Sequence, residues 1–165
     1  MIGASVAYGF RGISMNWLAR SMAVMAGLGL WTIPAQAQDA AEGERQFGRQ
    51  CVSCHVVRTP EGEVLAGRNA RTGPNLHGIE GRVIGSVEDF RYGDAMDRMR
   101  ERGVTWTEER FTAYVQDPTA WLRAALDDRR ARGKMAFRVR DPQAAADIYA
   151  YLETLASRQQ AERGN

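Results

Sequence analysis

The stretch Cys51-Val52-Ser53-Cys54-His55 decides the fold of this chain, because it has the C-x-x-C-H pattern of covalent haem attachment. Two thiols three residues apart on a helical turn point the same way, so both can form thioethers with the vinyl groups of one porphyrin. The histidine that follows is held beneath the iron, where an imidazole nitrogen can serve as an axial ligand. The pattern predicts one haem c, attached to Cys51 and Cys54 and ligated by His55.

Other interpretations of this stretch need features that the sequence lacks or leaves unexplained. A thioredoxin-type redox pair favours a βαβ context, which is absent, and gives no role to His55. A zinc site needs four good ligands, whereas the chain has only two cysteines and one further histidine, His77. A plain disulfide between Cys51 and Cys54 stays open as the simpler alternative.

The composition fits one domain of 165 residues with a modest core. Basic and acidic side chains nearly balance, 22 against 20, and Lys134 is the only lysine. No dense basic run with interleaved aromatic residues is present, so the sequence predicts no nucleic-acid partner. We expect a monomer.

The N-terminal segment has the pattern of a signal peptide. Arg11 and Arg20 precede the apolar stretch 22–33, and Ala35-Gln36-Ala37 is a small-x-small cleavage site. The apolar stretch is shorter than the roughly 20 residues that span a bilayer. We therefore expect residues 1–37 to be a signal peptide that is cleaved after Ala37.

Cleavage at this site leaves residues 38–165 as the mature domain, with a net charge near zero. Export to the periplasm agrees with the haem motif, because bacteria attach haem c outside the cytoplasm. Met1 and Met15 both stay open as the start of translation. An uncleaved segment 22–33 that anchors the protein to the membrane is the alternative.

The mature chain predicts helices that are joined by long loops. Asp39, with Glu42 three residues later, resembles a capping box at the start of a helix that reaches the haem cysteines. The segment Val56–Thr72 lacks apolar periodicity and predicts a loop, and no convincing strand pattern occurs. Helix starts are expected at three further positions, which are Thr107, Asp117-Pro118 and Asp141-Pro142.

Three apolar sets lie on predicted helices, and the first and last of them have the spacing of one helical face. The last of them predicts the final helix. They are Phe111, Tyr114 and Val115; Trp121, Leu122 and Ala125; and Ile148, Tyr151, Leu152 and Leu155. The sequence therefore predicts a small, all-α fold that is built around one haem.

An electron carrier needs a sixth iron ligand, and a methionine sulfur suits that role because it favours ferrous iron. The mature chain offers Met96 and Met99 in a polar stretch, and Met135 in a loop between two predicted helices. The loop position favours Met135 as the ligand opposite His55. His77 is the alternative, but its loop is bounded by Pro and Gly and we expect it to face solvent.

In the order of its motifs the chain resembles a class I cytochrome c, and most closely the large bacterial cytochrome c2 (c550-like) subgroup. The resemblance covers nearly all of the mature chain. It rests on Gly43, Phe47, Cys51–His55, Ala66–Ala70, Thr72–Leu76, Gly81-Arg82, Tyr92-Gly93, Trp106, Tyr114, Gly133-Lys134-Met135 and Tyr151-Leu152.

The resemblance implies a role for nine residues around the haem. His55 and Met135 would be the axial ligands, and Cys51 and Cys54 the thioether sites. The carbonyl of Pro74 would accept a hydrogen bond from the ligating imidazole, which fixes its tautomer. Three further positions match residues that surround a buried haem propionate; they are Arg82, Tyr92 and Trp106. Tyr114 matches a position near the methionine sulfur.

The resemblance also implies that Phe47 contacts Tyr151 and Leu152 where the first and last helices meet.

The chain departs from short cytochromes c at three places. Residues 123–132 form an insertion, and Met99-Arg100-Glu101 extends another loop. Gly133 stands where short cytochromes c have a threonine directly before the Lys-Met pair.

The function that the resemblance implies is that of a periplasmic electron carrier, not an enzyme. A cytochrome bc complex would be the donor. A terminal oxidase, a photosynthetic reaction centre or another reductase would be the acceptor, in respiration or photosynthesis. A peroxidase-type haem enzyme is the alternative. Cations near the haem are expected to guide docking; the candidates are Arg49, Arg129, Arg130, Arg132, Lys134 and Arg138.

Overall fold

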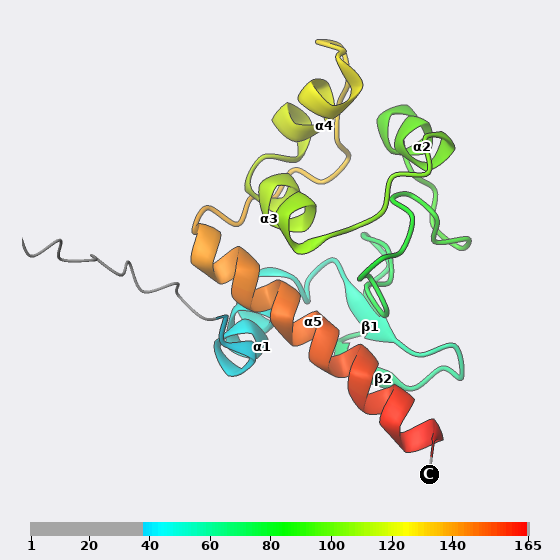
Figure 1. Ribbon diagram of the computed structural model, residues 1–165, viewed down its shortest axis with the longest axis vertical. Coiled ribbons are helices and arrows are strands. Elements are labelled where there is room, and N and C mark those ends of the chain that lie inside the picture. The colour runs from blue at the N-terminus through cyan, green and yellow to red at the C-terminus, as the bar shows by residue number, and fades with distance from the viewer. Residues whose placement is uncertain (1–37, 165) are drawn as a thin grey trace, which may run out of the picture. The chain divides into compact units, whose positions relative to one another are not determined.

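The computed structural model describes residues 38–164, so the predicted signal peptide lies outside the described residues. Their regular structure is mostly helical, with one short antiparallel sheet (Figure 1). In chain order the elements are α1 (Ala40–Gln50), β1 (Val56–Arg58), β2 (Val64–Gly67), α2 (Asp94–Glu101), α3 (Glu108–Gln116), α4 (Pro118–Leu126) and α5 (Pro142–Arg163). No helix among them is long and apolar enough to cross a membrane.

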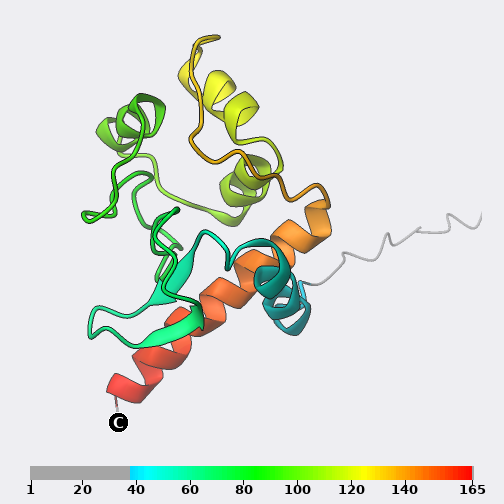
Figure 2. The ribbon, with the colours of Figure 1, turned by 180° about the vertical axis from the view of Figure 1, so that it is seen from behind.

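Helix α1 lies across α5, so the first and last helices of the described chain pack against each other (Figures 1 and 2). The rings of Phe47 and Tyr151 are 5.8 Å apart between centroids, and Phe47 and Leu152 are both 1 % exposed. Gly43 makes the close approach possible, since a Cβ atom there would lie 1.9 Å from the carbonyl oxygen of Asp147. The predicted contact between the first and last helices is confirmed.

The start of α1 differs from a capping box. The Asp39 carboxylate accepts hydrogen bonds from the backbone of Ala41 and Glu42, as predicted. The reciprocal bond is absent, because the Asp39 N–H donates to Asp147 Oδ1 on α5 at 2.9 Å, while the Glu42 carboxylate bonds to Arg45 instead. The Asp39 N–H is thus satisfied by a side chain of another helix. The spacing of residues within α1 could not indicate that partner.

The other three helix starts are confirmed. The side chains of Thr107, Asp117 and Asp141 each accept a hydrogen bond from a backbone N–H of the helix that follows. The predicted buried faces of α3 and α5 are also confirmed. On α4, Leu122 and Leu126 pack into the core, whereas Trp121 is half-buried and Ala125 is exposed.

The expectation of a loop over Val56–Thr72 is wrong in its first part, where β1 and β2 pair. Val56 stands opposite Gly67 and Val57 opposite Ala66, with an irregularity before Arg58. Strands of three and four residues are too short to show the alternation that identifies a strand in sequence. Val57 is 1 % exposed, so burial in the shared core holds this sheet.

The stretch that includes Met99-Arg100-Glu101 is also helical, since it ends α2 and does not extend a loop. Ala95 and Met99, four residues apart, are both buried under an otherwise charged helix. Asp94 in the first turn and Arg100 in the last turn suit the helix dipole. The many charged residues concealed this short amphipathic pattern.

Candidate haem-binding site

A cavity of about 320 Å³ opens among the helices, and all nine site residues predicted from the sequence line it. They come from segments far apart in the chain. Cys51, Cys54 and His55 follow α1, Pro74 and Arg82 follow the sheet, Tyr92 and Trp106 flank α2, Tyr114 lies on α3, and Met135 lies between α4 and α5.

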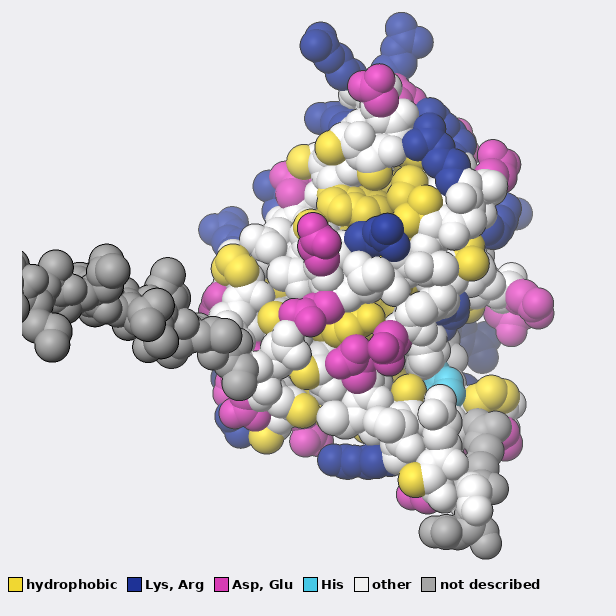
Figure 3. Space-filling view, viewed as in Figure 1, with side chains coloured by type: hydrophobic (Ala, Val, Ile, Leu, Met, Phe, Trp, Pro, Cys, Tyr) yellow, Lys and Arg dark blue, Asp and Glu magenta, His cyan; other side chains and the backbone are white. Residues whose placement is uncertain are grey.

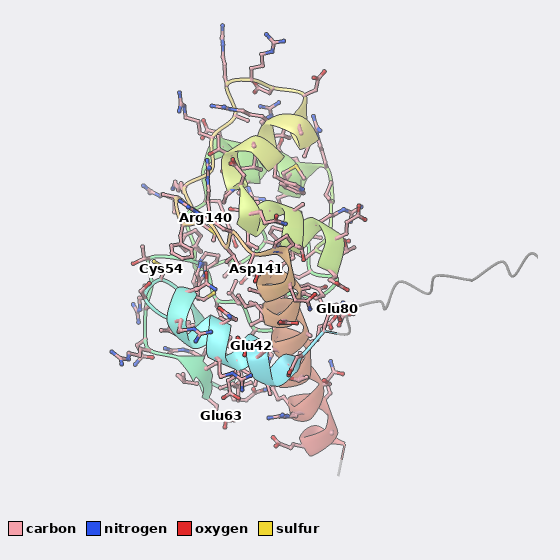
Figure 4. All side chains as sticks on the ribbon, turned by 90° about the vertical axis from the view of Figure 1, so that its left-hand side faces the viewer. Glu42, Cys54, Glu63, Glu80, Arg140 and Asp141 are labelled. Carbon is pink, nitrogen blue, oxygen red and sulfur yellow. The ribbon has the colours of Figure 1, made fainter. Side chains whose placement is uncertain are left out.

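The two cysteines continue the last turn of α1. The N–H groups of Cys54 and His55 both donate to the carbonyl of Cys51, at 3.1 and 2.9 Å. In Figure 4 Cys54 lies just beyond the end of α1. Both cysteines are free of disulfides. Burial raises the pKa of the Cys51 thiol to about 12, with a contribution from Cys54. A redox dithiol needs a lowered thiol pKa, so this environment does not suit one.

The imidazole ring of His55 is fixed on two sides. Its Nδ1 lies 2.9 Å from the carbonyl oxygen of Pro74, which accepts the hydrogen bond and leaves Nε2 free to act as a ligand. Gly73 lies so close that a Cβ atom there would be 2.3 Å from His55 Cε1. Burial lowers the pKa of His55, and the Pro74 hydrogen bond opposes that shift. The ring is therefore held neutral, which is the form that binds a metal.

Arg82 places a half-buried cation at the cavity without a carboxylate partner among residues 38–164. Its guanidinium donates to two backbone carbonyls, those of His77 at 2.7 Å and Asn75 at 3.0 Å. Burial lowers the pKa of Arg82, while nearby Tyr92 opposes that shift. A half-buried cation with only neutral acceptors suits a bound carboxylate, such as a haem propionate.

Aromatic side chains form one wall of the cavity. Trp106 and Tyr114 have ring centroids 5.2 Å apart, and both are buried. Trp121 packs behind them, stacked on Trp106 at 6.1 Å. Burial raises the pKa of the Tyr114 hydroxyl, which therefore stays protonated as a hydrogen-bond donor.

The structure separates the candidate sixth ligands. Met135 and Met96 both line the cavity, whereas Met99 does not and is buried in the core at 2 % exposure. His77 also lies outside the cavity lining. The expectation that His77 faces solvent is wrong, because its ring is half-buried and its Nε2 is buried without a hydrogen-bond partner. The Arg82 guanidinium also donates to the His77 carbonyl, a contact between two loop positions that the sequence pattern could not indicate.

Several lining residues had no assigned role in the sequence prediction. Gly73 supports the His55 ring, and its position in the Thr72–Leu76 motif was the available signal. Phe90 and Phe137 also line the cavity, and Phe137 is 48 % exposed at its margin. An isolated phenylalanine in a loop gives no pattern from which that position could be predicted.

The residues present fit a covalent haem. The paired thiols lie beside a neutral imidazole, the walls are largely apolar and aromatic, and Arg82 supplies a half-buried positive charge. Residues 38–164 contain no cluster of three or more His, Cys, Asp or Glu side chains that could hold a metal ion.

Comparison with known proteins agrees with this site. No family model matches the chain. It is 54 % identical to a cytochrome c2 of Rhodovulum adriaticum over 117 residues, which cover 71 % of this chain and 92 % of that protein. It is 40 % identical to a cytochrome c2 of Cereibacter sphaeroides over 145 residues, which cover 87 % and 99 %.

The crystal structure of cytochrome c2 from Rhodobacter sphaeroides superposes with a TM-score of 0.69 at 42 % identity. The match covers 72 % of this chain and 96 % of that one. Both the fold and the sequence of this chain are therefore similar to those of cytochrome c2 proteins. The chain therefore belongs to the cytochrome c2 family: it is a bacterial electron carrier, not an enzyme, and it contains one covalent haem c.

Proposed function

We propose that Cys51 and Cys54 hold the haem as thioethers and that His55 Nε2 and Met135 Sδ are the two axial ligands. The observation that carries this proposal is the convergence of the Cys51–His55 turn and Met135 on one cavity. Met96 also lines that cavity, but it lies within α2, whereas Met135 lies in a segment without regular secondary structure, from which its sulfur would reach the iron.

When bound, the haem supplies an iron that gains or loses a single electron. This chain's residues would hold both proposed ligands, His55 and Met135, in fixed positions. Pro74 and Gly73 fix the His55 ring, and a methionine sulfur favours the ferrous state and raises the reduction potential. Arg82, Tyr92 and Trp106 would surround a propionate and hold its charge inside the cavity, and the Tyr114 hydroxyl would act near the sulfur.

We further propose that the carrier works in the periplasm. Residues 1–37 would be a signal peptide, cleaved after Ala37, and residues 38–165 the mature cytochrome c domain. This rests on the basic, apolar and small-x-small pattern of the segment and on the need to attach haem c outside the cytoplasm.

The proposed electron donor is a cytochrome bc complex. The proposed acceptor is a terminal oxidase, a photosynthetic reaction centre or another periplasmic reductase. A peroxidase would need an acid–base group beside an open iron position. His77 is the only histidine available besides His55, and its absence from the cavity lining counts against that function.

Mass spectrometry of the protein from the periplasmic fraction tests the processing and the attachment together. The proposal predicts a chain that starts at Gln38 and carries one haem that survives denaturation. A mass that includes residues before Gln38 would defeat the cleavage proposal, and haem lost on denaturation would defeat covalent attachment. Conversion of either cysteine to serine should leave haem held by one thioether.

A further inference from the structure

Trp121 on α4 does not line the haem cavity, but it contacts two residues that do. Its ring is stacked on Trp106, with centroids 6.1 Å apart and an angle of 22° between the planes. It meets Tyr114 edge to face, with centroids 5.6 Å apart and an angle of 86°. Trp106 and Tyr114 also contact each other, at 5.2 Å. Each of the three rings therefore touches the other two.

The two lining rings depend on these contacts for their directions. Neither the Trp106 indole N–H nor the Tyr114 hydroxyl donates a hydrogen bond to another residue of the described chain. Backbone bonds fix only the main chain of Trp106, whose N–H donates to the Arg82 carbonyl at 2.9 Å and whose carbonyl accepts from Gly81 at 3.0 Å. Stacked and edge-to-face rings attract each other beyond the area that they bury. The ring contacts thus set where the two polar hydrogens point.

Helix α4 gives Trp121 a fixed position. The Asp117 side chain caps the helix by accepting a hydrogen bond of 3.0 Å from a backbone N–H in its first turn. Thr119 Oγ1 accepts a hydrogen bond from the Gly133 N–H at 3.2 Å, two residues before Met135. One helix therefore supports both the aromatic wall and the segment that carries the proposed sulfur ligand.

Trp121 also separates the lining rings from solvent. Trp121 is half-buried, whereas Trp106 and Tyr114 are buried, with 6 % and 7 % of their surface exposed. Figure 3 shows apolar side chains at the surface in the upper half of the molecule, where α3 and α4 lie in Figure 1. Loss of the Trp121 ring would therefore bring water closer to the two lining rings.

We propose that Trp121 is a positioning residue, which orients Trp106 and Tyr114 toward the haem and thereby raises its reduction potential. This inference rests on the proposed function, in which Trp106 lies beside a propionate and Tyr114 near the Met135 sulfur. A hydrogen bond to the sulfur withdraws electron density from it, and a donor beside the propionate offsets part of its negative charge. Both effects, together with exclusion of water, disfavour the ferric state.

The test compares Trp121→Leu with Trp121→Phe in the full holoprotein. Leucine removes both ring contacts, whereas phenylalanine keeps a ring that can still meet Tyr114. Tyr151→Leu is the matched control, because it also replaces a ring by leucine, and Tyr151 contacts Phe47 at 5.8 Å outside the cavity lining. The reduction potential is measured by redox titration and the stability by guanidinium unfolding.

Trp121→Leu should shift the equilibrium between the oxidised and reduced forms about tenfold toward the ferric state, which is about 59 mV for a one-electron couple. Trp121→Phe should have a potential between those of Trp121→Leu and the wild type. Tyr151→Leu should lose stability but keep the wild-type potential. A wild-type potential in Trp121→Leu, or an equal decrease in the control, would overturn the proposal.

The indole groups provide a readout that does not involve the potential. Trp17 and Trp31 lie within the predicted signal peptide, so the mature chain contains only Trp106 and Trp121. The NMR spectrum of reduced Trp121→Leu should therefore show a single indole N–H signal, that of Trp106. Its hydrogen exchange should be on the order of tenfold faster than in Tyr151→Leu, because local opening becomes easier. Equal exchange in the two variants would contradict the positioning role.

Tyr114→Phe and Trp106→Phe separate failure of this inference from failure of the proposed function. If both lining rings act on the haem as proposed, each of these variants lowers the potential. Lowered potentials in both, with a wild-type potential in Trp121→Leu, would overturn only the positioning role. Wild-type potentials in both would instead overturn the roles proposed for the lining rings.

Discussion

The ammonium group of Lys134 donates a hydrogen bond to the backbone carbonyl of Arg91 at 2.9 Å, and the lysine stem lies across Gly93. This contact joins the segment that carries Met135 to the segment that carries Tyr92. Both segments line the haem cavity, although Arg91 and Lys134 are 43 residues apart in the sequence. The lysine predicted only as a docking cation therefore also holds the proposed ligand loop in place.

Replacement of Lys134 by alanine should loosen that loop. The variant loses an exposed hydrogen bond and the packing of the stem, so we expect about 1 kcal/mol of lost stability in guanidinium unfolding. The ferric protein should also bind added imidazole faster, because the sixth ligand leaves more readily. Lys134→Arg, which keeps a cationic donor, is the control; equal imidazole rates in the two variants would show that the contact does not restrain Met135.

Methionine variants separate ligation from packing. Met135→Ala should lower the reduction potential strongly, because the ferrous state loses its soft ligand. Met99→Ala should leave the potential near that of the wild type while costing about 2–4 kcal/mol of stability, since Met99 is a core residue. Redox titration and unfolding of both variants provide the measurement. A large drop in potential for Met96→Ala, with Met135→Ala nearly unchanged, would reverse the assignment.

Two glycines of α1 offer a matched pair. A Cβ atom at Gly43 would lie 1.9 Å from the Asp147 carbonyl oxygen, whereas one at Gly48 would meet nothing within 4 Å. Gly43→Ala should therefore destabilise the fold by about 3 kcal/mol or more through overpacking. Gly48→Ala should stabilise it by about 0.5–1 kcal/mol, because alanine favours helix. Similar melting temperatures for the two variants would mean that α1 and α5 do not pack this closely.

Glu153 on α5 gives a pH-dependent prediction. Burial raises the pKa of its carboxyl group above 4.5, and the negative charges of Glu80 and Glu108 raise it further. The folded protein thus holds this proton more tightly than the unfolded chain, so stability falls as the pH rises through the unfolded and then the folded pKa. The penalty is complete at neutral pH and absent well below 4.5.

Glu153→Gln should accordingly stabilise the protein at pH 7, by no more than about 0.5 kcal/mol because the group is only partly buried and solvent screens its charge. The gain should vanish near pH 3. Unfolding curves at both pH values, with Glu88→Gln at an exposed glutamate elsewhere as the control, provide the measurement. A gain of the same size at both pH values would rule out relief of charge repulsion.

The sequence allowed much of the site to be predicted because its residues occur in short ordered motifs, from Cys51–His55 to Lys134-Met135. It could not show contacts that depend on segments far apart. The bond from Asp39 to Asp147 and the pairing of β1 with β2 both arise from tertiary packing. The burial of His77 and the ion pair of Arg98 with Asp128 have the same origin.

Ligation by His55 and Met135 is tested most directly by a reversible redox titration of the purified wild-type protein, followed by exposure of the reduced form to carbon monoxide. We expect a one-electron change with the spectrum of a single haem c, and a reduced spectrum that carbon monoxide leaves unchanged because Met135 and His55 would occupy both ligand positions of the iron. Rapid binding of carbon monoxide to the native reduced protein would contradict that ligation.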